Sequence, residues 1–290
     1  MKTKKALIWI IAVIITIAAA YYQRISGPTQ PVSYDFTLND STVKFRLPRS
    51  NQGVADFHIK LKMPEKVSGQ VIYRRFPTNE VWDTLQLARS NDTLKVLLPA
   101  QPAAGKLEYS VELFADGQAI EFGQKENILI RFRDDVPAGI MIPHVLLIFL
   151  AMLWANATGI LAAWNIPSYK KHAWITLIVF VVAGLIFGPL VQKAAFGAYW
   201  TGWPFGEDLT DNKVMLSVIF WILAVVLNRK KDRRWLVIVA ALVMFIIFMI
   251  PHSARGSEFN YESGEVVTGM MMLVGVAGGE IDEVFWKVME

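Results

Sequence analysis

Two histidines occupy matching positions in this sequence and could hold a metal centre. His144 and His252 each end a Met-Ile-Pro-His tetrapeptide, at residues 141–144 and again at 249–252. Two imidazoles on facing helices can serve as the axial ligands of a b-type haem. The repeated motif therefore predicts a haem b site if the two histidines meet in the fold.

A cluster of acidic residues offers a second kind of site. Glu207, Asp208 and Asp211 lie in one loop, residues 199–213. Carboxylates bind hard divalent cations, and together with imidazole they can form a mixed metal site. Thioether sulfur, which suits Cu(I), is offered by Met141, Met249 and residues 270–272. No ligand spacing such as His-x-x-x-His occurs, so the kind of metal, and whether any is bound, stays open.

The same residues also have a purely structural interpretation. Pro143 and Pro251 would mark a helix start and a helix end. Thr210 or Asp211 would cap the helix that follows the loop, where an acidic side chain is favourable. Aromatic residues typical of the lipid headgroup level are Tyr199, Trp200 and Trp203.

Hydrolysis is a further alternative, with Ser253 or Ser257 as nucleophile and His144 or His252 as base. His252 and Ser253 are sequence neighbours, which rarely places their reactive atoms well, and no Gly-x-Ser-x-Gly motif occurs. The sequence thus names no catalytic residue and does not decide whether the protein is an enzyme.

The composition places these residues in a membrane protein. Of 290 residues, 54% are hydrophobic, and ten Trp and seventeen Phe exceed what a soluble domain usually carries. The formal charge is +4, but the basic residues cluster beside apolar segments, which indicates membrane topology rather than nucleic-acid binding. Cysteine is absent, which excludes disulfides, thiolate metal sites, iron–sulfur clusters and covalently attached c-type haem.

Apolar segments predict five membrane spans. Residues 1–24 form an N-terminal signal anchor, or alternatively a signal peptide cleaved after the alanines at 18–20. Residues 141–252 form a four-helix bundle, whose predicted spans are about 143–164, 173–191, 211–228 and 235–251. In the span at 143–164, small residues recur every fourth position and predict a helix-packing seam: Ala151, Ala155, Gly159 and Ala163. We expect no Asp, Glu, Lys or Arg inside these four spans, and because ion pumps usually need ionisable groups at depth, this argues against an ion-coupled transporter.

Three basic clusters predict how the chain is oriented. The lysines at 2, 4 and 5, the loop 168–172 and the loop 229–234 should all remain cytoplasmic. Residues 31–135, the loop 193–212 and the tail 253–290 then lie outside, in a multi-pass protein of the bacterial inner-membrane type. In the tail, Arg255 is expected to pair with Asp208 or Glu207, and residues 270–286 indicate an amphipathic segment or, alternatively, a disordered one.

Residues 31–135 alternate apolar and polar side chains, which is typical of strands with one buried face. Turn residues separate the strands, for example Asn39-Asp40, Ser50 to Gly53 and the tight hairpin turn Asp116-Gly117. The segments 71–76, 98–102 and 105–113, together with Trp82, resemble fibronectin type III and immunoglobulin-like modules over about residues 32–134. The resemblance implies a β-sandwich with a binding or spacer role and carries no catalytic residue.

The sequence therefore predicts an α+β membrane protein, in which an extracytoplasmic immunoglobulin-like β-sandwich is joined to a helical transmembrane bundle. The expected function is binding or assembly within an envelope complex, with the lipid bilayer and a protein partner in contact with the chain. The loop 199–213 and its neighbours, including Trp203 and Arg255, would form the binding rim. The alternative is a redox or metal-handling protein that uses His144 and His252.

Overall fold

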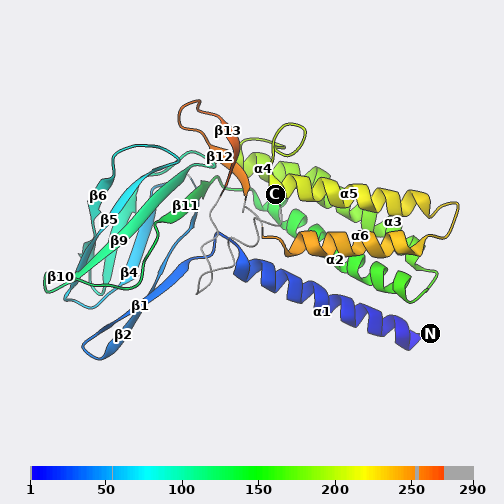
Figure 1. Cartoon of the computed structure of the whole chain (residues 1–290), viewed down its shortest axis with the longest axis horizontal. Coiled ribbons are helices and arrows are strands. Elements are labelled where there is room, and N and C mark those ends of the chain that lie inside the picture. The colour runs from blue at the N-terminus through cyan, green and yellow to red at the C-terminus, as the bar shows by residue number, and fades with distance from the viewer. Residues whose placement is uncertain (1, 54, 252–254, 271–290) are drawn as a thin grey trace. The chain divides into compact units, whose positions relative to one another are not determined.

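The computed structural model describes residues 2–53, 55–251 and 255–270, which divide into two compact units. The helix unit holds residues 2–27, 136–251 and 255–256, and the sheet unit holds residues 28–53, 55–135 and 257–270. The chain is thus of the α+β class, with helices and sheets in separate parts (Figure 1). Each unit is described by itself below.

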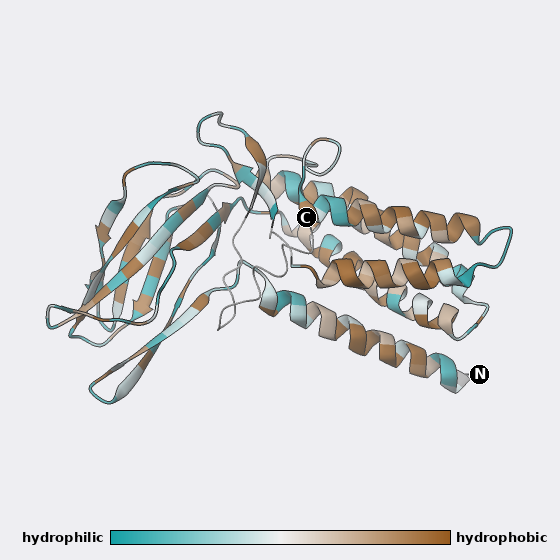
Figure 2. Cartoon of the chain, in the orientation of Figure 1, coloured by the Kyte–Doolittle hydropathy of each residue, from teal (hydrophilic) through white to brown (hydrophobic). Residues whose placement is uncertain are grey.

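The helix unit contains four helical stretches that are long and apolar enough to cross a membrane: Thr3–Ser26, Ala138–Ala163, Tyr169–Phe196 and Leu209–Leu227. Its helices are α1 (Lys2–Ser26), α2 (Ala138–Ala163), α3 (Tyr169–Val181), the π-helix η1 (Val182–Phe187), α4 (Gly188–Phe196), α5 (Leu209–Leu227) and α6 (Arg234–Met249). Helix α6 is also apolar but has only 16 residues. Figure 2 shows apolar residues along the helices and hydrophilic residues in the connection between α5 and α6. The protein is a multi-pass membrane protein.

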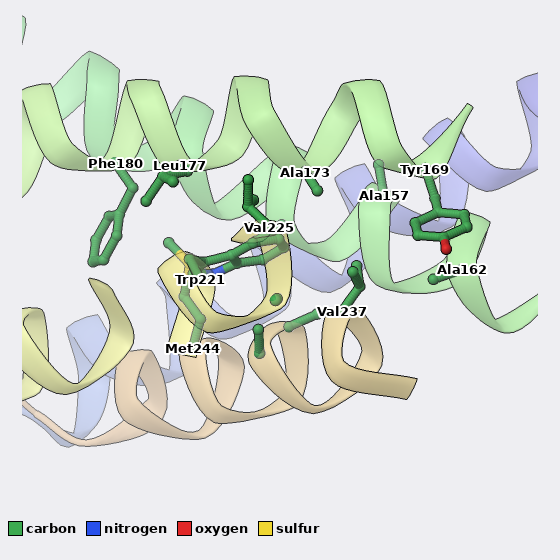
Figure 3. Packing of buried hydrophobic residues seen from close by; sticks show 14 of the residues in the cluster. Ala157, Ala162, Tyr169, Ala173, Leu177, Phe180, Trp221, Val225, Val237 and Met244 are labelled. Carbon is green, nitrogen blue, oxygen red and sulfur yellow. The ribbon is translucent and has the colours of Figure 1, made fainter. Parts of the chain in front are cut away.

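Small residues let the helices of this unit approach closely. A Cβ added at Gly159 of α2 would lie 2.7 Å from the Cβ of Ala241 on α6, so only glycine fits there. Ala151 and Ala155 are buried beside it, whereas Ala163 at the end of α2 is exposed, so the predicted seam stops one turn early. Trp221 of α5 is fully buried and donates its indole N–H to Met244 Sδ at 3.2 Å (Figure 3).

Hydrogen bonds between Asn and Thr side chains also join helices within the apolar interior. Asn156 Nδ2 of α2 donates to Thr16 Oγ1 of α1 at 3.0 Å. The hydroxyls of Thr158 and Thr176 lie 3.3 Å apart and link α2 to α3. Polar side chains in an apolar medium are stable only when they find such partners, so these bonds fix the rotation of α1, α2 and α3 about their axes.

The sheet unit is built mainly from antiparallel strands. They are β1 (Val32–Leu38), β2 (Ser41–Leu47), β3 (Ser50–Gln52), β4 (Phe57–Lys62), β5 (Val67–Phe76), β6 (Asp83–Gln86), β7 (Ala88–Ser90), β8 (Thr93–Leu98), β9 (Lys106–Ala115), β10 (Gln118–Ala119), β11 (Ile128–Arg133), β12 (Arg255–Phe259, whose first two residues belong to the helix unit) and β13 (Val266–Met270). The largest sheet has the order β3-β11-β9-β5-β6, with β10 beside β9. A three-stranded sheet has the order β4-β8-β7, and β1-β2 and β12-β13 are two-stranded.

The largest and the three-stranded sheets share one hydrophobic cluster. Residues of both sheets lie in this cluster and are at most 1% exposed: Ile59 of β4, Leu94 of β8, Val71 of β5, Leu107 of β9 and Ile130 of β11. The shared cluster forms because apolar and polar residues alternate in these strands and successive side chains of a strand point to opposite faces. The sheets therefore form two layers around a common core.

The turn predictions in this unit have mixed outcomes. Asp116 and Gly117 both have positive φ and join β9 to β10, as the hairpin prediction required. Residues 50–53 were expected to be a turn, but Ser50–Gln52 form strand β3, which pairs in parallel with β11. The Gly53 N–H donates to the Arg133 carbonyl at 3.0 Å and ends this pairing. Polar turn-type residues form a strand here because a partner strand, 81 residues later in the sequence, supplies the hydrogen bonds.

The described part of the tail is structured and belongs mostly to the sheet unit. Strand β12 places Glu258 against Lys106 as a buried ion pair, and the Phe259 N–H donates to the Ala104 carbonyl at 3.1 Å. The Tyr261 hydroxyl donates to Gln101 Oε1 at 2.8 Å. The amphipathic segment expected at 270–286 lies almost entirely outside the described residues.

Candidate functional site

The predicted site residues gather at one end of the helix unit, which we call the rim: residues 197–213, the end of α6 at 248–251, and His144. The Lys213 ammonium donates to the Ile250 carbonyl at 3.0 Å, which joins the start of α5 to the end of α6. The Gln23 amide donates to the Phe248 carbonyl at 2.8 Å, which brings the end of α1 to the same place. His252 lies outside the described residues, so the predicted meeting of His144 and His252 stays a prediction.

His144 lies inside helix α2 rather than at its start. The N–H groups of Ile140 and Met141 already bond to the Pro137 carbonyl at 2.9 and 3.0 Å, so the helix begins before Pro143. Pro143 therefore lies inside the helix, where its ring removes the backbone hydrogen bond to the Gly139 carbonyl. The expectation that Pro143 marks the helix start is therefore wrong by about one and a half turns.

The imidazole of His144 is oriented by the π-helical segment. Its Nδ1 lies 3.1 Å from the carbonyl oxygen of Ala183 in η1, and the same carbonyl accepts the N–H of Gly188. A carbonyl can only accept, so Nδ1 carries the proton and Nε2 of the neutral ring keeps its lone pair. This is the tautomer that a metal-binding histidine with a backbone partner adopts.

Asp208 caps helix α5. One carboxylate oxygen accepts the Thr210 N–H at 2.8 Å and the Asp211 N–H at 3.4 Å, and the other accepts the Thr201 hydroxyl at 3.1 Å. The cap was expected at Thr210 or Asp211. The helix starts earlier than the apolar pattern indicates, because α5 begins at Leu209 and the residue before it supplies the capping oxygen.

Asp211 holds the loop that precedes the helix. Its Oδ2 accepts the backbone N–H groups of Thr201 at 2.7 Å and Gly202 at 3.0 Å, and the side chain is 7% exposed. Asn212 Oδ1 accepts the Trp203 N–H at 2.7 Å. Three consecutive loop amides are thus bonded to two side chains of α5, which orders the loop.

Gly202 is required for this arrangement. A Cβ at this position would lie 2.5 Å from the Asp211 Cβ and 2.8 Å from Asn212 Oδ1. Neither atom can move without breaking the bonds to the loop amides. Sequence reasoning missed Gly202, although a glycine between two tryptophans, two residues after Trp200 and directly before Trp203, was a visible signal.

Lys213 is a buried cation in the first turns of α5. It is 6% exposed, and its Nζ donates to the carbonyls of Ile250 at 3.0 Å and Pro251 at 3.5 Å. These carbonyls at the end of α6 would otherwise lack helical partners. The expectation that no charged residue lies within the spans is therefore wrong for α5, which contains both Asp211 and Lys213.

Three large aromatic residues of the rim remain exposed. Tyr199 is 57%, Trp203 63% and Phe205 83% exposed, although the backbone between them is held by Asp211 and Asn212. The Trp200 indole donates to the Trp203 carbonyl at 3.1 Å. Phe205 was not singled out from the sequence, and it is the most exposed of the three. The rim is thus an ordered loop that displays apolar side chains.

The remaining predicted rim residues form a surface ion pair. Arg255 pairs with Glu207, as expected, and both side chains are largely exposed. Exposed ion pairs contribute about 0–1 kcal/mol because water screens them. This pair therefore ties the start of β12 to the rim loop only weakly.

The hydrogen-bond donors around Asp208 and Asp211 are relevant to the predicted metal site. Oxygens of Asp208 and Asp211 accept hydrogen bonds from backbone N–H groups and a hydroxyl, which is the environment of a structural carboxylate. Within the part of the chain that the structure describes, no group of three or more His, Cys, Asp or Glu residues is arranged to hold a metal ion. Met271 and Met272, like His252, lie outside that part.

The chain matches no protein-family model, no curated protein and no solved structure. Its function must therefore be inferred from the contacts of its own side chains.

Proposed function

We propose that this protein is a binding or assembly component of an envelope complex, and that it presents a folded extracytoplasmic domain and the rim to a partner. The proposal combines a five-span topology, an immunoglobulin-like β-sandwich and a rim loop built for contact. Each part has support in the described residues.

The proposed orientation is supported by the position of the basic clusters. The ring of Trp9 in α1 lies 5.7 Å from that of His172 in α3, and Tyr169 donates a hydrogen bond to Asp232 in the α5–α6 connection. The three basic segments therefore gather at one end of the helix unit, opposite the rim. Basic ends remain cytoplasmic, which puts the rim outside.

A fifth span by α6 is supported by its packing. Its 16 residues rise about 24 Å, slightly less than the hydrocarbon thickness of about 30 Å. Val237, Ala240 and Met244 are fully buried in the helix-unit core, so α6 lies among the longer helices. Neighbouring protein can shield the ends of such a short helix.

The proposed sandwich is supported by the two layers of the sheet unit. Sheets that share one core and leave polar residues outside are the architecture of immunoglobulin-like modules. Tyr109 of β9 is fully buried and donates its hydroxyl to the Pro48 carbonyl at 2.7 Å, which ties the loop after β2 to the largest sheet. The binding role of this domain is proposed by analogy with such modules, because the fold alone does not specify a function.

The observation that carries the proposal is the construction of the rim loop. Its buried polar groups hold the backbone, and Trp203 and Phe205 project from it. Aromatic side chains on an ordered support bury large area at low entropic cost, which is typical of interface hot spots. Aromatic residues at the headgroup level would need no such scaffold.

Site-specific photocrosslinking in native membranes tests this function. A photoreactive phenylalanine analogue at Phe205 should give one discrete protein adduct, and Trp203→Ala should reduce its yield severalfold. The matched control is the same analogue at Trp235, which is 59% exposed at the opposite end of the helix unit. Lipid adducts alone at position 205 would reject the binding role. A reporter fused after Asn228 that is active outside the cell would reject the orientation.

The alternative function, a metal or haem protein, is favoured by one observation: the Ala183 carbonyl holds the Nδ1–H of His144 and leaves Nε2 for a ligand. The visible spectrum and elemental analysis of the purified protein test it. A Soret band or stoichiometric metal that disappears in the His144→Ala/His252→Ala variant would make this function the primary one.

A further inference from the structure

A cavity of about 130 Å³ lies at the basic end of the helix unit, between α3, α5 and α6. Its floor consists of small apolar side chains from all three helices: Ala173, Ala224, Val225 and Val237. Ala173 and Val237 face the space between the helices (Figure 3). The side chains of this floor present apolar surface, so the floor suits an apolar ligand group.

The polar groups beside the floor already have partners. The Tyr169 hydroxyl donates its proton to Asp232, and Asn228 Oδ1 lies 3.1 Å from the same hydroxyl. The Asn228 amide donates to the Ala224 carbonyl at 2.7 Å and to the Arg233 carbonyl at 3.1 Å. Since these groups are satisfied, the inner cavity offers little to a small hydrophilic ligand.

The mouth of the cavity is positively charged. Lys170 and Arg229 line it, and both are exposed. The neighbouring connection 229–234 carries five basic residues and one acid, Asp232, which is engaged by Tyr169. Trp174 also lines the cavity, is 44% exposed and follows Lys170 by one helical turn, the position of an aromatic residue at the headgroup level.

We propose that this cavity is a binding site for an anionic glycerophospholipid, whose phosphate contacts Lys170 and Arg229 while its glycerol and proximal acyl carbons enter the apolar floor. Basic crevices between transmembrane helices recognise lipid headgroups in this way. The satisfied, apolar interior distinguishes a lipid from free phosphate, because phosphate would meet only the two cations at the mouth. The inference uses the helix unit alone and does not depend on a partner at the rim.

Native mass spectrometry of the full chain in mild detergent tests the site. Dioleoyl phosphatidylglycerol should remain bound, whereas dioleoyl phosphatidylcholine, with the same acyl chains, should be lost. The Lys170→Gln/Arg229→Gln variant should bind the anionic lipid about 30-fold more weakly, from the usual contribution of two basic residues near an anionic surface. Both side chains are exposed, so the variant should fold.

The matched control is Lys230→Gln/Lys231→Gln, which removes the same amount of charge from the α5–α6 connection at residues that do not line the cavity. It should change lipid binding less than threefold, in keeping with screened charge near the surface. Equal retention of the two lipids, or equal weakening in the two variants, overturns the proposal. Displacement of the lipid by glycerol phosphate at an equal concentration also overturns the proposal and indicates a phosphate site.

Discussion

The ion pair between Lys106 and Glu258 should dominate the stability of the sheet unit, and Glu258→Leu tests this. The Lys106 side chain is 2% exposed and the Glu258 side chain 12%, so water screens the pair little. Burial lowers the pKa of Lys106, while Glu258 acts in the opposite direction. Removing one partner of a buried ion pair costs about 3–5 kcal/mol, because the remaining charge has lost its compensation.

The proton equilibrium of Lys106 sets an upper limit to this cost. Losing the proton at pH 7 costs about 4.6 kcal/mol, from 1.36 kcal/mol per pKa unit and an ordinary lysine pKa near 10.4. In Glu258→Leu the opposing carboxylate is gone, so burial lowers the pKa of Lys106 further, and the penalty stops growing once the lysine is neutral. The deficit of Glu258→Leu should then shrink as the pH rises above 7, because the unfolded chain binds the proton more strongly than the folded one.

Amide hydrogen exchange of strands β9 and β11 in the full chain is the assay. Protection should fall by about 10²–10⁴-fold in Glu258→Leu at pH 7. It should largely return in Lys106→Met/Glu258→Leu, since an apolar pair of similar volume is often neutral or better. The control is Asp92→Asn, which breaks the exposed pair between Lys62 and Asp92 and should leave protection nearly unchanged. A double variant as unstable as the single one would refute the reasoning.

Three further predictions concern the rim and the tail. Gly202→Ala should destabilise the rim loop by about 1–3 kcal/mol and shift Trp fluorescence, whereas Gly139→Ala, where a Cβ meets nothing within 4 Å, should not. Asp208→Ala should lower helix-unit stability by about 1 kcal/mol in thermal unfolding, and Asp208→Asn should restore most of it. Burial raises the pKa of Tyr261 from 10.0 to about 12, so its contribution to sheet-unit stability is complete below pH 10 and is lost as pH rises toward 12. Tyr261→Phe should therefore flatten the alkaline decrease in denaturant midpoint, and an unchanged decrease contradicts this.

Local chemistry determined much of the fold from the sequence. Strand alternation, as in Tyr34 and Phe36, and the turn Asp116-Gly117 act through neighbouring residues, so the pattern is readable without tertiary contacts. The apolar segments are equally local, because the length of hydrocarbon that a helix must cross sets the length of the run. The α+β class follows from these two patterns.

Only the tertiary structure determines the different roles of Asp208 and Asp211 at the rim. The sequence pattern offers Thr210 or Asp211 as the cap, whereas the structure makes Asp208 the cap and Asp211 the acceptor for the loop amides. From the sequence alone, Lys213 is a charge that is unfavourable within a membrane span. In the structure, two carbonyls at the end of α6 accept hydrogen bonds from it. These roles depend on backbone groups that come from other helices.

The tail shows most clearly the difference between what the sequence pattern indicates and what tertiary contacts determine. Its polar residues 255–265 indicate an exposed segment, yet Glu258 is buried because Lys106, 152 residues earlier, supplies the opposite charge. Strand β3 likewise exists only because β11 offers an edge. A sequence pattern reports what each residue prefers among its neighbours, whereas hydrogen bonds and ion pairs between distant segments exist only once the chain has folded.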